Sequence, residues 1–197
     1  MKIKICGLKR MEDIDYVNHY LPDYIGFVFA SSKRQVDLIQ AKQLKAKLNQ
    51  KIKAVGVFVN QDIEYITTLA NLHIIDLIQL HGQEDQNYIN ELIKQTTLPI
   101  IKAICMKDEN SYETYQNIDY YLLDSRQAGS GQTFDWKWIK QLDKPIFLAG
   151  GIDDHNIDQA LKQNVYSLDV SSGVETNGVK DEKKIEKLIR RIRHDKG

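Results

Sequence analysis

Two residues that could act as an acid and a base each end a short apolar segment of this sequence. Cys6 ends the first segment and is followed by Gly7, and Asp124 ends the sixth. An unperturbed thiol titrates at about 8.5, close enough to neutral pH to serve as a general base. An apolar setting raises the pKa of a carboxyl group and lets it hold a proton for use as a general acid. The pair therefore indicates acid–base chemistry.

Each of these residues also has a purely structural interpretation. Cys6 could be a small buried hydrophobic residue, and Asp124 could cap the loop that follows it. Cys105 ends the fifth apolar segment. From position alone, Cys105 is an equal candidate for the base.

Glycine and serine follow the last two apolar segments. Gly150 and Gly151 come after the seventh, and Ser172 and Gly173 come after the eighth. Glycines let backbone N–H groups approach an anion, and a serine adds a hydroxyl donor. Ordinary turns are the alternative, but two such motifs at consecutive strand ends predict a phosphate site.

Two further polar residues follow other apolar segments. Arg34 follows the second, where its guanidinium could hold a substrate carboxylate in a bidentate fork. A solvated surface arginine is the default interpretation. His81 follows the fourth segment, where a histidine is more often structural than catalytic. The other histidines show no metal-ligand spacing and there is no C-x-x-C motif, so we expect no metal site.

The segments that must position these residues alternate between strand-like and helix-like. Most strand-like segments are apolar at consecutive positions, which is typical of parallel strands buried on both faces. Eight segments are read as strands: Lys2–Cys6, Tyr24–Phe29, Lys53–Val59, Asp76–Leu80, Ile100–Ile104, Tyr120–Asp124, Pro145–Leu148 and Ser167–Val170. Amphipathic helices are expected between them; the last carries Ile185, Leu188, Ile189 and Ile192 on one face.

Eight strand–helix units predict an α/β fold, a (β/α)₈ barrel formed as a single domain by residues 1–197. An open doubly wound sheet is the alternative, but its usual five or six strands would leave two or three segments unexplained. In a barrel, the residues after the strands share the mouth at the C-terminal ends of the strands.

The composition limits the classes of partner. Lys and Arg together number 27, as do Asp and Glu, so the formal net charge is zero. This balance argues against a nucleic-acid or membrane partner. Neither a secretory signal nor an apolar run of about 20 residues is present. We therefore expect a cytoplasmic protein with reduced thiols and a small-molecule substrate.

The motifs as a set resemble the phosphoribosylanthranilate isomerase family of tryptophan biosynthesis. They recur in family order over essentially the whole chain, and the first and last together form a specific combination. The matching stretches are Lys4–Leu8, Gly26–Phe29, Val55–Asn60, Gln79–Gly82, Leu122–Asp124, Thr133–Trp136, Leu148–Gly151 and Asp169–Glu175.

The resemblance implies an Amadori rearrangement of N-(5-phosphoribosyl)anthranilate to 1-(o-carboxyphenylamino)-1-deoxyribulose 5-phosphate. Asp124 matches the family's general acid, which protonates the furanose oxygen. Cys6 matches the general base, which removes the C2′ proton; Cys105 matches no family motif. No cofactor is implied, because the Schiff-base nitrogen belongs to the substrate.

The resemblance also implies the binding residues. Arg34 matches an arginine that meets the anthranilate end of the substrate, and His81 and Asp169 match polar residues of the same mouth. The phosphate would be bound at Gly150, Gly151, Ser172 and Gly173.

The chain departs from the family pattern near the arginine. Lys9 stands where a small polar residue is usual, and Ser32-Lys33-Arg34-Gln35 replaces Ser-Pro-Arg-Tyr. Residues 125–133, with Gly129-Ser130-Gly131 as a variant of Gly-Thr-Gly, could form a lid over the site.

Two other functions are compatible with a phosphate-binding barrel. A related histidine-pathway isomerase would typically be longer and carry aspartate in place of Cys6. A catalytically silent barrel would bind a phosphorylated metabolite without turnover, but Cys6 and Asp124 are both present. The oligomeric state, monomer or homodimer, is not fixed by the sequence.

Overall fold

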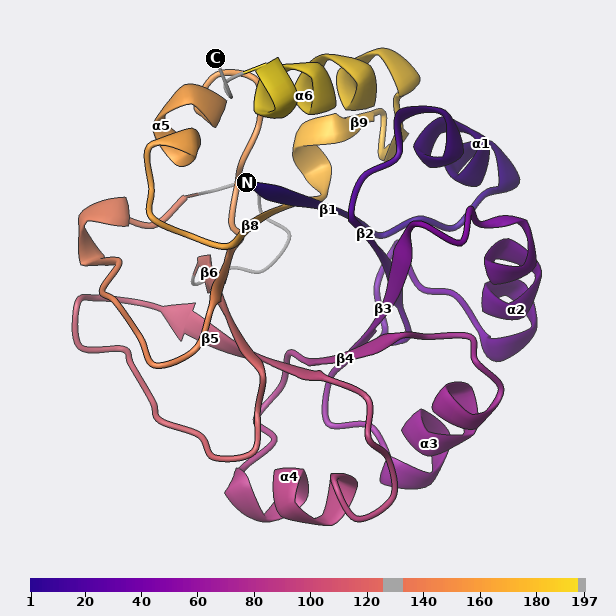
Figure 1. The fold of residues 1–197 in the computed structure, drawn as a ribbon, viewed down its shortest axis with the longest axis vertical. Helices are drawn as coiled ribbons and strands as arrows, with labels where there is room; N and C mark the ends of the chain where they lie inside the picture. Colours follow the sequence, from indigo (N-terminus) through magenta and orange to yellow (C-terminus); the bar gives the residue numbers. More distant parts are fainter. Residues whose placement is uncertain (126–132, 195–197) are drawn as a thin grey trace.

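A computed structural model of the chain describes residues 1–125 and 133–194. Eight parallel strands form a closed barrel in which each strand pairs with its neighbours in sequence and β8 pairs with β1 (Figure 1). The expectation of a (β/α)₈ barrel is thus confirmed. The strands are β1 (Lys2–Cys6), β2 (Tyr24–Val28), β3 (Lys53–Phe58), β4 (Leu77–Leu80), β5 (Ile100–Met106), β6 (Tyr120–Ser125), β7 (Ile146–Leu148) and β8 (Ser167–Val170).

Helices surround the barrel on its outer side (Figure 1). They are α1 (Met11–Tyr20), α2 (Leu38–Lys47), α3 (Ile63–Asn71), α4 (Gln86–Leu92), α5 (Ile157–Leu161) and α6 (Glu182–His194). In α6, Ile185, Leu188, Ile189 and Ile192 are all buried, as their spacing predicts.

The expectation of eight complete strand–helix units is wrong on one side of the barrel. Residues 107–119, between β5 and β6, form turns and extended chain without a helix, and between β6 and β7 the described residues form only a 3₁₀ turn, η1 (Trp136–Trp138). Residues 107–119 are rich in Asn, Asp, Ser and Thr, which favour turns, and lack an apolar helical stripe. Tyr112 and Tyr115 instead pack against the core.

The barrel interior explains why the strands are apolar at successive positions. Alternate residues of adjacent strands point inward. Toward the N-terminal ends of the strands, away from the mouth, the inward residues form one buried apolar cluster. It includes Tyr24, Val55, Leu77, Ile101, Leu122 and Phe147. The outward residues pack beneath the helices in a second, larger cluster. Both faces of each strand are therefore buried, as in parallel sheets generally.

A short hairpin follows the barrel. Strands β9 (Glu175–Thr176) and β10 (Val179–Lys180) are antiparallel and pair Glu175 with Lys180. Asn177 and Gly178 connect them, both with positive φ, as a tight Asn-Gly hairpin turn requires. The hairpin lies between η2 (Ser172–Val174) and α6, so it continues from the end of β8.

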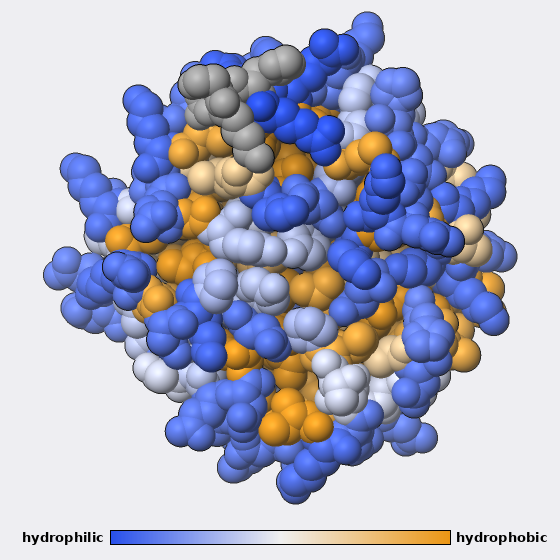
Figure 2. All heavy atoms as spheres, in the orientation of Figure 1, coloured by the Kyte–Doolittle hydropathy of each residue, from blue (hydrophilic) through white to orange (hydrophobic). Residues whose placement is uncertain are grey.

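The surface is predominantly polar. On the face shown in Figure 2, hydrophilic residues occupy most of the periphery and hydrophobic residues are exposed in smaller areas between them. Among the helices of the described part of the chain, none combines the length and the apolar character needed to cross a bilayer.

Candidate active site

A cavity of about 280 Å³ lies at the C-terminal ends of the barrel strands. Eight of the nine residues predicted for the site line it: Cys6, Arg34, His81, Asp124, Gly150, Gly151, Asp169 and Ser172. The ninth, Gly173, is not among the lining residues. The structure thus brings together side chains that lie up to 166 positions apart in the sequence.

Cys6 ends β1 with its thiol pointing into the barrel mouth. Its neighbour across the sheet is Gly26, and a Cβ at Gly26 would lie only 2.6 Å from the Cys6 Sγ. Burial raises the pKa of the Cys6 thiol above its ordinary value, and Asp169 acts in the same direction. The Lys4 and Lys180 ammonium groups oppose the rise in pKa without cancelling it.

Asp124 ends the apolar run of β6 and is buried. Its Oδ1 accepts a hydrogen bond from the backbone N–H of Ser125 at 2.7 Å. Its Oδ2 lies 3.2 Å from Nε2 of His81. The register pairs Asp124 with Cys105 of β5, so the second cysteine is the neighbour of the acid rather than of Cys6. Cys105 is exposed.

A second cavity, of about 580 Å³, adjoins the first along His81 and Asp124, which line both. Cys105, Lys102 and Tyr115 are among its other lining residues. The two cavities together are large enough for an elongated small molecule, since ligand sites commonly measure about 300–1,000 Å³.

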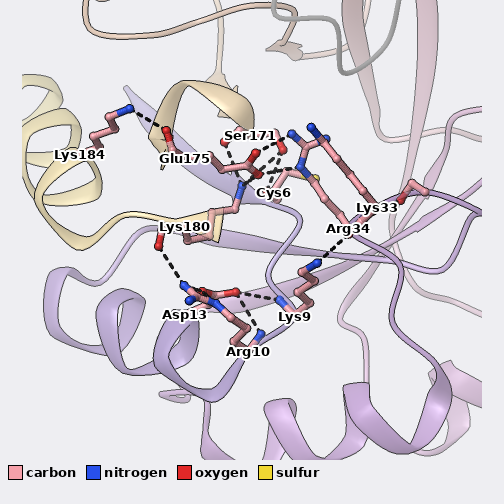
Figure 3. Close-up of polar contacts among 11 residues, drawn as sticks. Cys6, Lys9, Arg10, Asp13, Lys33, Arg34, Ser171, Glu175, Lys180 and Lys184 are labelled. Carbon is pink, nitrogen blue, oxygen red and sulfur yellow. Dashed lines mark hydrogen bonds and ion pairs between the residues drawn. The ribbon is translucent and has the colours of Figure 1, made fainter. Parts of the chain in front are cut away.

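Arg34 is buried and forms a bidentate ion pair with Glu175 (Figure 3). Its Nε donates to Oε1 at 2.7 Å and its Nη2 donates to Oε2 at 2.8 Å. Lys180 also donates to Glu175, at 2.7 Å. Burial acts to raise the pKa of Glu175, but the two cations outweigh it and hold that pKa at about 2. The pair uses one edge of the guanidinium, which leaves Nη1 for another acceptor.

The two departures from the family pattern contact each other in the loop that carries Arg34. The Lys9 ammonium donates to the carbonyl of Lys33 at 2.8 Å (Figure 3). The loop also closes on itself, because Gln35 N–H donates to the carbonyl of Ser32 at 3.1 Å. The loop therefore has its own anchors in the absence of proline.

Asp169 lies one layer below the mouth, beside Lys4. The Lys4 ammonium donates to Asp169 Oδ2 at 2.7 Å and to Gln79 Oε1 at 2.8 Å. The Gln79 amide nitrogen lies 2.9 Å from Nδ1 of His81. Among the described residues, nothing donates a hydrogen bond to the buried Oδ1 of Asp169. A buried acceptor without a donor is costly, so this atom is suited to a ligand hydroxyl.

The two loops of the predicted phosphate site approach each other closely. Gly150 and Gly151 both have positive φ, which glycine adopts without strain. Within the described part of the chain, no protein group accepts from their N–H groups. A Cβ at Gly173 would lie 2.0 Å from the carbonyl oxygen of Ile152, so this glycine permits the contact between the loops.

Four residues around the site carry no role in the sequence analysis: Lys4, Gln79, Glu175 and Lys180. All four are buried polar or charged residues. Lys4 and Gln79 each stand two positions before a predicted site residue, on the same inward face of a strand. A polar residue inside an otherwise apolar strand was the available signal. Glu175 and Lys180 carried no comparable pattern.

One predicted feature falls mostly outside the described residues: the possible lid over residues 125–133, of which 126–132 are not described. Across the ranges 1–125 and 133–194, no group of three or more His, Cys, Asp or Glu residues is arranged to hold a metal ion.

Comparison with known proteins places this geometry in a family. Residues 3–191 match the family model described as N-(5'phosphoribosyl)anthranilate (PRA) isomerase. The N-(5'-phosphoribosyl)anthranilate isomerase of Endomicrobium trichonymphae is 46% identical over 197 residues, with 98% of each chain covered.

Solved structures of the same description share the fold. The crystal structure of phosphoribosyl anthranilate isomerase from Thermus thermophilus superposes with a TM-score of 0.87 at 29% identity, covering 98% of this chain and 99% of that one. A phosphoribosyl anthranilate isomerase in complex with reduced 1-(o-carboxyphenylamino)-1-deoxyribulose 5-phosphate superposes at 0.81 and 28% identity, with 98% and 99% covered. The family model and the relative both match essentially the whole chain, and the chain therefore belongs to the N-(5'-phosphoribosyl)anthranilate isomerase family.

Proposed function

We propose that this chain isomerises N-(5'-phosphoribosyl)anthranilate to 1-(o-carboxyphenylamino)-1-deoxyribulose 5-phosphate, with Asp124 as the general acid and Cys6 as the general base. The observation that carries the proposal is that a carboxyl group from β6 and a thiol from β1 line one cavity together with Arg34 and the glycine loops. Family membership supplies the substrate.

Asp124 acts first in this mechanism. It donates its proton to the furanose ring oxygen while the bond between that oxygen and C1′ breaks. The lone pair of the anilino nitrogen forms the C=N bond of a Schiff base. The Ser125 N–H and His81, which contact the two carboxylate oxygens, are placed to stabilise the anion that remains.

Cys6 acts second. Its thiolate removes the proton from C2′; the electron pair of that C–H bond forms a C1′=C2′ double bond, and the π pair of the C=N bond returns to nitrogen to give an enolamine. Proton transfer from the C2′ hydroxyl to C1′ then gives the ketone. C1′ is reduced and C2′ is oxidised, so the electrons balance within the substrate. The raised pKa of Cys6 makes its thiolate scarcer but more basic.

The two ends of the substrate differ in charge distribution and would be held differently. The anthranilate carboxylate would accept from the Nη1 side of Arg34, whose other edge is fixed by Glu175. The phosphate would accept from backbone N–H groups of Gly150 and Gly151, with Ser172 beside them. Asp169 Oδ1 would accept from a sugar hydroxyl, which satisfies its unpartnered lone pairs.

The experiment is turnover of freshly generated phosphoribosylanthranilate, followed by loss of its fluorescence, for wild type and Asp124→Asn. Asparagine preserves the shape of the side chain but has no proton to give. Turnover by wild type with a loss of about 10²-fold or more in the variant is expected. Equal rates would discard Asp124 as the acid.

The same assay separates the alternatives. No turnover by folded wild type would overturn the proposed activity. Turnover of a bulkier aminoaldose of the histidine pathway would then support the related isomerase, and binding of the reduced product analogue without turnover would indicate a silent binder.

A further inference from the structure

We propose that Gln79 and Lys4 are positioning residues that fix His81 as a neutral imidazole with its single proton on Nε2, directed at Asp124. The inference rests on the proposed role of Asp124 as the acid. It is carried by a chain of contacts that crosses the barrel interior from β8 to β6, in which each member dictates the orientation of the next.

The direction of the chain begins at Lys4. An ammonium group has donors and no acceptor, so both atoms that it contacts must be acceptors. One is Oδ2 of Asp169, at 2.7 Å, and the other is the amide oxygen of Gln79, at 2.8 Å. The reverse orientation of the Gln79 amide would place its NH₂ group against the ammonium, so Lys4 fixes which way the amide points.

The amide orientation then decides the proton on His81. With its oxygen on Lys4, Gln79 presents NH₂ to Nδ1 of His81, at 2.9 Å. The amide nitrogen is a donor only, so Nδ1 must be the unprotonated, accepting nitrogen. In a neutral imidazole the proton is then on Nε2, which lies 3.2 Å from Asp124 Oδ2 and donates to it.

Burial makes this arrangement hard to reverse. Lys4 is 0% exposed and Gln79 is 1% exposed, so water cannot easily replace either partner. Turning the amide over would set its NH₂ group against the Lys4 ammonium, donor against donor, and its oxygen against the lone pair of Nδ1, in an interior where unmatched polar groups are costly.

This form of His81 leaves the proton of Asp124 available for transfer to the substrate. An imidazolium at His81 would hold Asp124 as an anion and remove the proton that the reaction needs. The opposite neutral tautomer would present a lone pair to Asp124 and could take that proton. The Nε2–H tautomer does neither: it brings no positive charge and no lone pair to Asp124, and the hydrogen bond that it donates becomes stronger once the carboxyl proton has gone to the substrate.

The first test observes the tautomer directly in the ligand-free wild type. Proton-coupled ¹⁵N NMR of histidine-labelled protein distinguishes protonated from unprotonated ring nitrogens, and comparison with His81→Asn identifies the His81 signals. At neutral pH, Nε2 protonated and Nδ1 unprotonated is the expected result. A proton on Nδ1, in either the other tautomer or the imidazolium, would overturn the proposal.

The second test uses Gln79→Glu, with Gln79→Met as the control of similar length. Glutamate accepts from Lys4 and also from a protonated Nδ1, so it favours the two forms of His81 that compete for the acid's proton. We expect kcat to fall about 10-fold or more with KM changed less than about threefold, as for an effect on the chemical step. Methionine favours neither form and should cost less.

A double-variant comparison shows whether the effect passes through His81. Asparagine at position 81 can donate to Asp124 but has no second tautomer, so Gln79→Glu should cost at most about threefold in the His81→Asn background. The same large loss in both backgrounds would mean a merely structural role for Gln79 and would contradict the proposal.

The outcomes also separate this inference from the proposed function. The NMR result does not depend on turnover and stands by itself if Gln79→Glu fails to fold. If Asp124→Asn kept the wild-type rate, the acid assignment would be wrong even with the expected tautomer. If Asp124→Asn were inactive but Nδ1 carried the proton, only the positioning role would be lost.

Discussion

Gly26 lies beside Cys6 so closely that a Cβ on Gly26 would come within 2.6 Å of the Cys6 Sγ. The two residues are partners in the parallel pairing of β1 and β2. The absence of a side chain at position 26 therefore creates the space that the thiol occupies. Gly26 is one residue of the matched Gly26–Phe29 motif, and its role in this geometry is steric.

Gly26→Ala should displace the thiol without removing it. Real Cβ atoms essentially never approach another atom within 3.0 Å, so the Cys6 side chain must rotate or the strands must move. We expect turnover to fall by about 10²-fold, since a misplaced base loses most of its contribution. Thermal unfolding of both proteins is the control. Wild-type turnover in Gly26→Ala would show that the position of the Cys6 thiol is not critical.

The two cysteines make a matched pair for testing the base. Cys6, beside Gly26, lines the smaller cavity, and Cys105, beside Asp124, lines the adjoining one. Cys6→Ala should lower turnover by at least about 10²-fold while binding of the reduced product analogue survives. Cys105→Ala should keep near-wild-type turnover. The reverse pattern would transfer the base to Cys105.

The ionisation of the Cys6 thiol should reflect its burial. Burial raises the pKa of this thiol above its usual value, and a base is active only when deprotonated. The fraction of Cys6 thiolate should therefore still be increasing with pH between 7 and 9, as measured by the rate of Cys6 alkylation in Cys105→Ala protein. Lys180 opposes the rise in pKa, so Lys180→Met should move this alkylation profile to higher pH. A profile unchanged in Lys180→Met, or one that levels off well below pH 9, would contradict this account.

Glu175 should make an acid-sensitive contribution to stability. Its pKa in the folded protein is about 2, below the ordinary value of 4.5, so the stabilisation is present above about pH 4.5 and is lost as the pH falls toward 2. At pH 7, Glu175→Gln should lower the free energy of unfolding by about 3 kcal/mol, because it leaves two buried cations without their carboxylate.

Urea denaturation of wild type and Glu175→Gln at a series of pH values would measure that difference. The gap should stay constant from pH 7 to about 5 and shrink from pH 4.5 toward 2, as Glu175 takes up a proton and becomes neutral like the glutamine. A gap that is already small at pH 7, or independent of pH, would mean that the ion pair contributes little.

The strands and the residues that end them are the part of this protein that the sequence by itself determined. Short runs apolar at consecutive positions identified all eight strands, because strands buried on both faces require apolar residues on both. Closure of the barrel then brings every strand end to one mouth, so Cys6 and Asp124 could be expected to lie close together. The absence of a helix at 107–119 was not predicted, although those residues lack an apolar stripe.

Only the tertiary structure decided which polar groups face one another inside the barrel. Arg34 and Glu175 are 141 positions apart, and Lys4 and Gln79 are 75 apart. Their pairing depends on strand register and on the depth of each inward layer, neither of which leaves a local pattern in the sequence. The thiol's space beside Gly26 and the fixed orientation of the Gln79 amide arise in the same way, because each is set by a neighbour that only the closed barrel supplies.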